Sequence, residues 1–301
     1  MAEREYENTL SSARPDRGKS DDRRGFPGQR MRVSKRFVDR ARPALRRYQK
    51  VLESAKKRDV NESDTSVIVS DILTDVLGYD KYQEVTTELA VRGTFCDLAI
   101  KIHGRLQYLI EVKSIGTELK ANHLRQAIEY GSREGIEWVL LTNGNVWQAH
   151  RIRFEQPIDH DLVFEVDLID GVTKTSDLLE KLYLVSREAG NASAIDLYWQ
   201  GKEATSRYVL AQLILSEGVL HVIRRQLRSL FKGTKITPEE LATVLQLEVL
   251  KRDVLEGDKA GIAAKTVKRA VRRRLRARRD TDSIPLGEDP TKPAAGATPS
   301  T

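Results

Sequence analysis

The sequence has a single cysteine and no long apolar run, and each shortage excludes a class of protein. Its only cysteine is Cys96, which excludes an intramolecular disulfide framework, a CxxC redox pair and a cysteine-rich zinc site. No apolar run approaches the roughly 18 residues of a membrane span, and residues 1–36 are polar throughout. We therefore expect neither a transmembrane helix nor a secretory signal, and a cytoplasmic protein that does not bind membranes.

A phosphate-binding loop for nucleotides is also missing. Residues 18–20 read Gly-Lys-Ser, but the GxxxxGK[ST] motif needs a glycine where Ala13 stands and a buried strand before it. We expect no nucleotide cofactor.

Charges of one sign are concentrated in separate segments. Residues 1–60 hold 18 basic and 9 acidic side chains, residues 61–170 hold 10 and 19, and residues 265–279 hold 9 basic and no acidic ones. Basic segments on both sides of an acidic middle suggest a polyanionic partner, because Lys and Arg can neutralise phosphates. The alternative is that these segments are only solvated tails.

The residue pattern predicts an α/β domain followed by an all-helical extension. We expect a disordered arm at 1–32, a basic helix within 33–60 that Pro43 disturbs, an α/β domain at 61–170, a helical domain at 171–261, a basic helix at 262–279 and a disordered tail at 280–301. Within the α/β domain, strands are expected at 95–102, 106–113, 138–142, 146–152 and 163–168, and helices at 67–77 and 121–132.

The first two strands have a preferred register. Apolar residues alternate along both strands, and a three-residue turn at 103–105 would place Ile100 opposite Tyr108 and Leu98 opposite Ile110, with all eight apolar side chains on one face. The same register places Asp97 opposite Glu111 on the other face. A two-residue turn would separate these carboxylates unless a bulge compensates for it.

Two carboxylates and Lys113 on one sheet face suggest a metal site. Neighbouring carboxylates repel each other unless a cation lies between them, and an oxygen-only pair suits Mg²⁺ or Mn²⁺. Such an ion can polarise a phosphate oxygen, while a lysine stabilises the charge that develops. The alternative is a solvated strand face with an incidental ion pair.

The wider motif strengthens the metal interpretation. It consists of Glu62, Asp97, Glu111-Val112-Lys113 and Gln126-Ala127-Ile128-Glu129-Tyr130, with Leu-Gly-Tyr-Asp at 77–80 and a Thr-Asn-Gly-Asn segment at 142–145. This order resembles the PD-(D/E)XK nuclease superfamily, and more closely the N-terminal nuclease domain of the type I restriction enzyme R subunit. The resemblance covers about residues 61–152. It departs from that family at Cys96, which replaces a proline, and in the absence of a helicase motor.

The resemblance implies a restriction-endonuclease-like fold and assigns roles to the motif residues. Asp97, Glu111 and the carbonyl of Val112 would bind the metal, and Lys113 would position the attacking water. Glu62 would complete the metal shell, or is an ordinary acidic residue in a first helical turn. Gln126 and Tyr130 would contact DNA phosphates or brace Lys113, or form a polar helix face.

Outside the motif, two further expectations concern DNA contacts. On the basic helix, Arg272, Arg273, Arg276 and Arg279 are expected to face outward and bind DNA, above a thin seam of Val267, Val271 and Leu275. Trp147 is expected in the core, with base stacking as the alternative.

These observations lead to one functional hypothesis and two rivals. The hypothesis is Mg²⁺-dependent endonucleolytic hydrolysis of DNA, as in restriction-modification, by an enzyme whose further partner is a second copy of the chain or a specificity or motor subunit. The first rival is a catalytically silent nucleic-acid-binding or regulatory module with the same fold. The second is a structural protein whose basic segments bind acidic partners.

Overall fold

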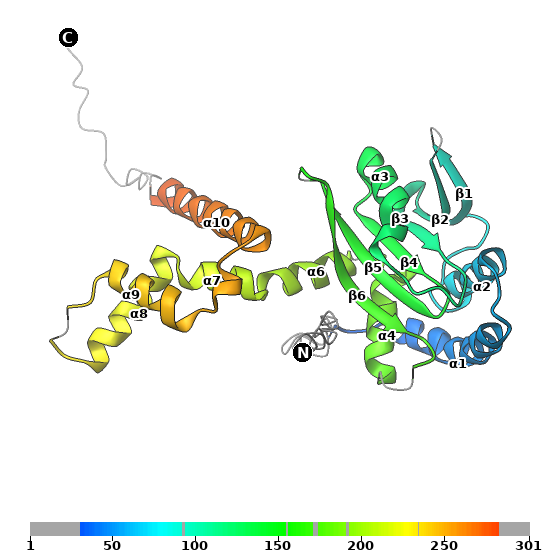
Figure 1. Cartoon of the computed structure of the whole chain (residues 1–301), viewed down its shortest axis with the longest axis horizontal. Coiled ribbons are helices and arrows are strands. Elements are labelled where there is room, and N and C mark those ends of the chain that lie inside the picture. Colours follow the sequence, from blue (N-terminus) through cyan, green and yellow to red (C-terminus); the bar gives the residue numbers. More distant parts are fainter. Residues whose placement is uncertain are drawn as a thin grey trace, which may run out of the picture. The chain divides into compact units, whose positions relative to one another are not determined.

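The computed structural model of the chain describes residues 31–91, 94–154, 156–170, 174–190, 193–233 and 235–282, with the backbone alone given between 88 and 95 and between 275 and 282. Most of the expected arm (to residue 30) and tail (from residue 283) lie outside the described residues. The chain forms two compact units, one ending at Trp199 and the other starting at Gln200. Figure 1 shows the helices and strands of both units.

The first unit is built on a six-stranded sheet in which each strand pairs with the next one along the chain. The strands are β1 (Val85–Val91), β2 (Thr94–Ile102), β3 (Arg105–Val112), β4 (Trp138–Thr142), β5 (Val146–Arg153) and β6 (Asp159–Asp167). Among these strands β3 and β4 alone run parallel. Their crossover contains the 3₁₀ turn η1 (Ala121–Leu124) and helix α3 (Arg125–Glu134). The predicted α/β class, a mixed sheet flanked by helices, is confirmed.

Helices cover both faces of this sheet (Figure 1). Helices α1 (Lys35–Arg58), α2 (Glu62–Asp75) and α4 (Thr175–Leu184) share a core with one face, through residues such as Leu52, Leu73 and Leu182. On the opposite face, α3 buries Ala127 and Tyr130. Both faces of the central strands are therefore apolar, which fixes the strands between two helical layers.

Helix α1 runs without a break through Pro43. The disturbance expected at this proline therefore does not interrupt the helix. Its buried side chains recur every three or four residues: Phe37, Ala41, Leu45, Tyr48, Leu52 and Ala55. Proline removes one backbone donor from a helix. Pro43 lies on the exposed side of α1, and packing on both sides of it holds the helix together.

The β2–β3 hairpin differs from the expectation in its turn but agrees in its register. His103 and Gly104 have φ values of 51° and 77°, and Ile102 pairs with Arg105, so the turn has two residues rather than three. A bulge after Ile100 compensates, and Ile100 pairs with Tyr108 as predicted. The predicted single apolar face is wrong for two of its eight residues, because Cys96 and Leu106 pack on the α3 side. The other six lie in the opposite core cluster, as expected: Leu98, Ile100, Ile102, Tyr108, Ile110 and Val112.

The boundary between the units differs from the expected one at residue 170. Helix α4 and the short α5 (Arg187–Gly190) belong to the sheet unit, since Leu178, Leu179 and Ala189 are buried in the same cluster as the sheet. The helix α6 (Ala194–Ala204) spans the boundary.

The second unit is helical, as expected, and has a small core. It contains α7 (Arg207–Ile214), α8 (Glu217–Leu230), α9 (Pro238–Val244), the π turn η2 (Leu245–Val249), the 3₁₀ turn η3 (Arg252–Val254) and α10 (Asp258–Asp282). Its buried apolar residues are Ala211, Leu220, Val254, Ala260 and Ala263. Across the described parts of the chain, no helix is long and apolar enough to cross a membrane.

Candidate active site

Three elements meet where β3 ends. Lys113 directly follows β3, and its backbone N–H donates to the carbonyl of Thr142 at the end of β4 (2.8 Å). Helix α2 begins beside this point, with Asn61 as its N-cap, since the Asn61 side chain accepts from the N–H of Asp64 (2.9 Å). Glu62 is therefore in the first turn of α2, and its side chain reaches Lys113.

The ammonium of Lys113 is the centre of the cluster. Its Nζ donates to Glu111 Oε1 (2.7 Å) and to the Val112 carbonyl (2.9 Å), and it lies 3.5 Å from Glu62 Oε2. The Glu111 and Lys113 side chains are 7% and 18% exposed, whereas Glu62 is 50% exposed. A mostly buried ion pair thus opens to solvent on the side of α2.

Asp97 is attached to the same segment from β2. Its Oδ2 accepts a hydrogen bond from the backbone N–H of Val112 (2.7 Å). Register pairs between β2 and β3 extend only as far as Leu98 and Ile110, so the carboxylate of Asp97 takes the place of a strand carbonyl. The expected direct pairing of Asp97 with Glu111 is replaced by a contact one residue further along β3.

The cluster contains three carboxylates and one ammonium, so its formal charge is −2. Burial raises the pKa of Glu111, and the charges of Asp97 and Glu62 act in the same direction, although the hydrogen bond from Lys113 opposes them. Burial alone would lower the pKa of Lys113, but its hydrogen bond with Glu111 and the surrounding carboxylates raise it overall. The formal charge of −2, rather than the burial that mainly raises the pKa of Glu111, is what favours binding of a further cation.

The donor set fits an oxygen-preferring divalent ion. Glu111, the Val112 carbonyl and Glu62 already surround one cation, the ammonium of Lys113, and all of them present oxygen. Among the described residues, no three His, Cys, Asp or Glu side chains stand close enough to form a complete metal site. An ion here would therefore use few protein ligands and keep several waters, as Mg²⁺ does.

The two residues of α3 that are expected to contact DNA, Gln126 and Tyr130, differ in their exposure to solvent. Gln126 is exposed, whereas Tyr130 is 3% exposed and packs in the core on the α3 side of the sheet. No hydrogen bond joins either side chain to Lys113 in the described structure. Their DNA contacts stay predictions, and the burial of Tyr130 favours a packing role. Trp147 is 2% exposed, which confirms its expected core position.

On α10, Arg272 and Arg273 are exposed as expected, and the side chains of Arg276 and Arg279 lie outside the described residues. Val267 and Val271 are partly buried, in agreement with a thin apolar seam. Helix α10 belongs to the second unit, whereas the cluster around Lys113 belongs to the first.

Sequence reasoning missed the residues that hold the loop after Lys113. The Asn143 side-chain amide donates to the Thr117 carbonyl (2.9 Å), and the hydroxyls of Ser114 and Thr117 are 2.6 Å apart. Asn143 also accepts from the N–H of Val146 (2.7 Å), which closes the turn between β4 and β5. The Asn143-Gly144 pair correctly predicted this turn, but no local signal indicated that it would reach across to Thr117.

Comparison of the chain with models of protein families, with curated proteins and with solved structures finds no match.

Proposed function

We propose that this protein is a Mg²⁺-dependent nuclease with a restriction-endonuclease-like fold that hydrolyses phosphodiester bonds in DNA. The observation that carries the proposal is the convergence of Glu62, Glu111 and the Val112 carbonyl on the ammonium of Lys113. Glu62 and Lys113 are 51 residues apart in sequence, so the fold has to bring them together. Their order along the chain supports the resemblance to PD-(D/E)XK nucleases.

Each side chain has a distinct role in this proposal. Glu111, Asp97 and the Val112 carbonyl would hold the ion, with Glu62 at the solvent side. The ion would supply polarisation of a phosphate oxygen and a more acidic bound water. Lys113 would donate hydrogen bonds to the attacking water or to a phosphate oxygen, in place of those it gives Glu111 and Val112. The hydrogen bond from Val112 N–H fixes the orientation of the Asp97 carboxylate.

A catalytically silent nucleic-acid-binding module is the second candidate, and one observation favours it. Lys113 contacts the same oxygens that the ion would need, and the described residues include no group of three His, Cys, Asp or Glu close enough to bind a metal. In a silent module, this ion pair would simply close the end of the sheet. The two candidates differ in whether a divalent ion binds and supports cleavage.

Cleavage of supercoiled plasmid by the full chain, with 5–10 mM Mg²⁺ or with EDTA, separates these candidates. We expect nicking that requires Mg²⁺, with loss of at least ~100-fold in rate for Lys113→Ala, the scale of a lost transition-state donor. Lys120→Ala is the matched control, because Lys120 lies in the following loop and its side chain is 63% exposed. Equal rates for wild type and Lys113→Ala would exclude Lys113 from the mechanism. Wild-type protein that binds DNA without any Mg²⁺-dependent cleavage would favour the silent module.

DNA affinity is proposed to come in part from α10. If about six of its basic side chains contact phosphates, α10 contributes about −5 to the slope of log K against log salt. Ala263 of α10 is 1% exposed within the second unit, so deleting the helix would disturb that unit. Substituting the exposed Lys268, Arg269, Arg272 and Arg273 by Gln is therefore the sharper test. The slope should become shallower by about 4, without a change in sequence preference. An unchanged slope would remove α10 from the interface.

A further inference from the structure

Helix α1 carries a row of basic side chains without acidic partners. Arg42, Arg46 and Lys50 follow one another at four-residue spacing, so they lie on one side of the helix, and all three are exposed. Among the described residues, none of the three forms an ion pair or a side-chain hydrogen bond. We name these residues the α1 row.

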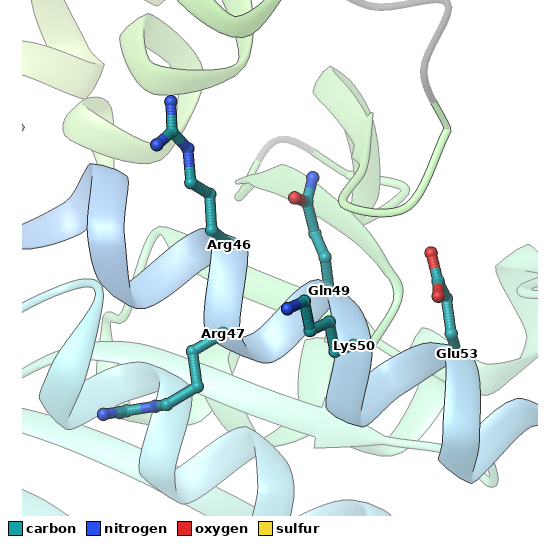
Figure 2. A pocket seen from close by; sticks show the side chains of 5 residues that line it. All are labelled: Arg46, Arg47, Gln49, Lys50 and Glu53. Carbon is teal, nitrogen blue, oxygen red and sulfur yellow. The ribbon is translucent and has the colours of Figure 1, made fainter.

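Neighbouring basic residues of the same helix behave differently. Arg40 forms an ion pair with Glu188, and Arg47 forms one with Asp75. Figure 2 shows Arg46, Gln49 and Glu53 reaching to one side of α1 and Arg47 to the other. Arg40 and Arg47 are thus neutralised by acidic side chains of the same unit, whereas the α1 row is left to solvent.

The α1 row is unfavourable for the isolated protein. Like charges four residues apart destabilise a helix by about 0.2–0.5 kcal/mol per pair, and the row contains two such pairs. A shallow hollow lies beside it, lined by Arg46, Arg47, Gln49, Lys50 and Glu53 (Figure 2). Gln49 is fixed there by a hydrogen bond to the Leu168 carbonyl (2.7 Å). The exposed acids nearest in sequence, Asp39 and Glu53, form no ion pair with the row.

The α1 row also lies on the helix that leads to the candidate active site. The C-cap residue of α1, Asp59, abuts the loop after Lys113, since a Cβ added to Gly116 would be 2.5 Å from Asp59 Oδ1. At 1.5 Å per residue, Lys50 is about 12 Å of helical rise from the end of α1 at Arg58. The two arginines of the row are about 6 Å apart along the helix axis, so they can contact different phosphates of a duplex, which carries one charge per ~3.4 Å of axis on each strand.

We propose that the α1 row binds the phosphate backbone of duplex DNA and guides it toward the cluster around Lys113. This inference rests on the proposed function, because it names the surface that holds the substrate of that site. The segment 61–170 has a large excess of acidic side chains, so phosphates need a basic surface close to it. The α1 row is such a surface within the same compact unit as the cluster.

The test measures binding of the full chain to a fluorescent 30-base-pair duplex in EDTA, so that cleavage plays no part. Between 50 and 200 mM KCl, we expect R42Q/R46Q/K50Q to show a log K against log salt slope shallower by about 3 than that of wild type. The charge-preserving variant R42K/R46K/K50R should keep the wild-type slope. The variant K101Q/R105Q/K120Q, which removes three positive charges around the β2–β3 hairpin and the following loop, should change the slope by less than 1.

Three binding results would overturn the inference. An unchanged slope for R42Q/R46Q/K50Q would show that the α1 row does not touch DNA. Equal effects of both neutralised variants would show that only net charge matters. Loss of binding to vesicles containing 30% phosphatidylserine, with DNA binding unchanged, would assign the row to an anionic membrane surface. Cleavage assays with Mg²⁺ are run separately, so a protein that binds DNA through the row but never cleaves it would contradict the nuclease proposal alone.

Folding of the neutralised variant is checked by thermal melting. Because two like-charge pairs are removed from α1, the melting temperature should stay the same or rise slightly. A fall of several degrees would mean that the row contributes to stability. That result would remove the reason for assigning it to an external partner.

Discussion

Replacing Lys113 by Met is the most informative single perturbation of the cluster. The change keeps most of the length of the side chain and removes the ammonium, so Glu111, whose side chain is 7% exposed in the wild type, loses its hydrogen-bonded partner. Breaking a buried ion pair typically costs 3–5 kcal/mol. Lys113 is 18% exposed, so water replaces part of the interaction, and we expect the lower end, about 3 kcal/mol. For a unit of this size, the melting temperature would fall by about 6–12 °C near pH 8.

The size of this loss depends on pH. In the wild type, burial raises the pKa of Glu111 against the opposing effect of Lys113. A carboxyl whose pKa is raised on folding adds stability that is present at pH values below its unfolded pKa and is lost as the pH rises through its folded pKa. Without Lys113 the pKa rises further, and Glu111 takes up a proton instead of remaining as an unpaired anion. The difference between wild type and Lys113→Met should therefore be smaller at pH 5 than at pH 8.

Melting curves of the full chain at the two pH values test this reasoning. The double variant Glu111→Gln/Lys113→Met should recover most of the lost stability, because a neutral amide needs no counter-ion. Lys120→Met, at an exposed position, should melt like the wild type. Mg²⁺ should raise the melting temperature of Lys113→Met more than that of wild type, since the ammonium no longer competes for the same oxygens. A variant that melts like wild type at pH 8 would refute the account of the ion pair.

Further predictions concern three buried positions. Burial lowers the pKa of His150 to about 3, so the contribution of neutral His150 to the free energy of unfolding is fully present above about pH 6.5. That free energy should fall by about 1.4 kcal/mol per pH unit as the pH drops from 6.5 toward 3. His150→Gln should remove this dependence in urea titrations. Burial raises the pKa of Cys96 to about 12, and the thiol should react with a disulfide reagent only after unfolding, so fast labelling of the native protein would contradict its position. Gly144 has a φ of 81°, and an added Cβ would lie 3.3 Å from both Leu52 and Thr65. Gly144→Ala should therefore lower the free energy of unfolding by about 1–3 kcal/mol, measured by thermal melting. A loss below about 0.5 kcal/mol would argue against backbone strain at this position.

Local patterns predicted the strands with the strongest apolar character. The expected bounds of β4 agree with the structure, and β5 is one residue longer than expected, because these strands are continuous or alternating apolar runs bounded by turn residues. Strand β1 was not predicted, because Thr86 and Thr87 interrupt its apolar pattern. Its extended conformation is stabilised by pairing with β2, a contact that its own sequence does not indicate.

Long-range packing was less predictable. Helical structure was correctly expected after residue 170, but the place of α4 against the sheet depends on contacts with α1 and β6 that no local pattern encodes. The two-residue turn of the β2–β3 hairpin was missed because His103 occupies a left-handed conformation that Asn or Asp usually takes in such turns. The pairing of Ile100 with Tyr108 was still predicted correctly, because the apolar pattern of the two strands determines it. The bulge after Ile100 compensates for the turn being one residue shorter than expected.

The motif predicted that Asp97 and Glu111 would lie near Lys113, but not how these side chains would be held, and it gave no indication that Tyr130 would be buried on the α3 side. The spacing of Asp97, Glu111 and Lys113 was sufficient to expect one cluster. The hydrogen bond from Val112 N–H to Asp97 forms because the pairing of β2 with β3 reaches no further than Leu98 and Ile110, and strand alternation alone cannot indicate where pairing ends. The contact of Glu62 with Lys113 depends on where α2 begins and on how α2 packs on the sheet. The Asn61 cap indicates the first of these in the sequence, but nothing local indicates the second.

The two charged surfaces of the sheet unit can coexist because of the distance between them. The cluster around Lys113 has a formal charge of −2, which attracts a divalent cation and repels phosphates. From Lys50, the nearest residue of the α1 row in sequence, the helix alone rises about 12 Å before it ends beside the cluster. The Debye length is about 8 Å at physiological ionic strength and about 30 Å at 0.01 M salt. Near physiological salt each surface therefore keeps its own field, so the α1 row can hold a phosphate backbone without neutralising the carboxylates. At 0.01 M salt the fields overlap, and neutralising the α1 row should then strengthen cation binding at the cluster.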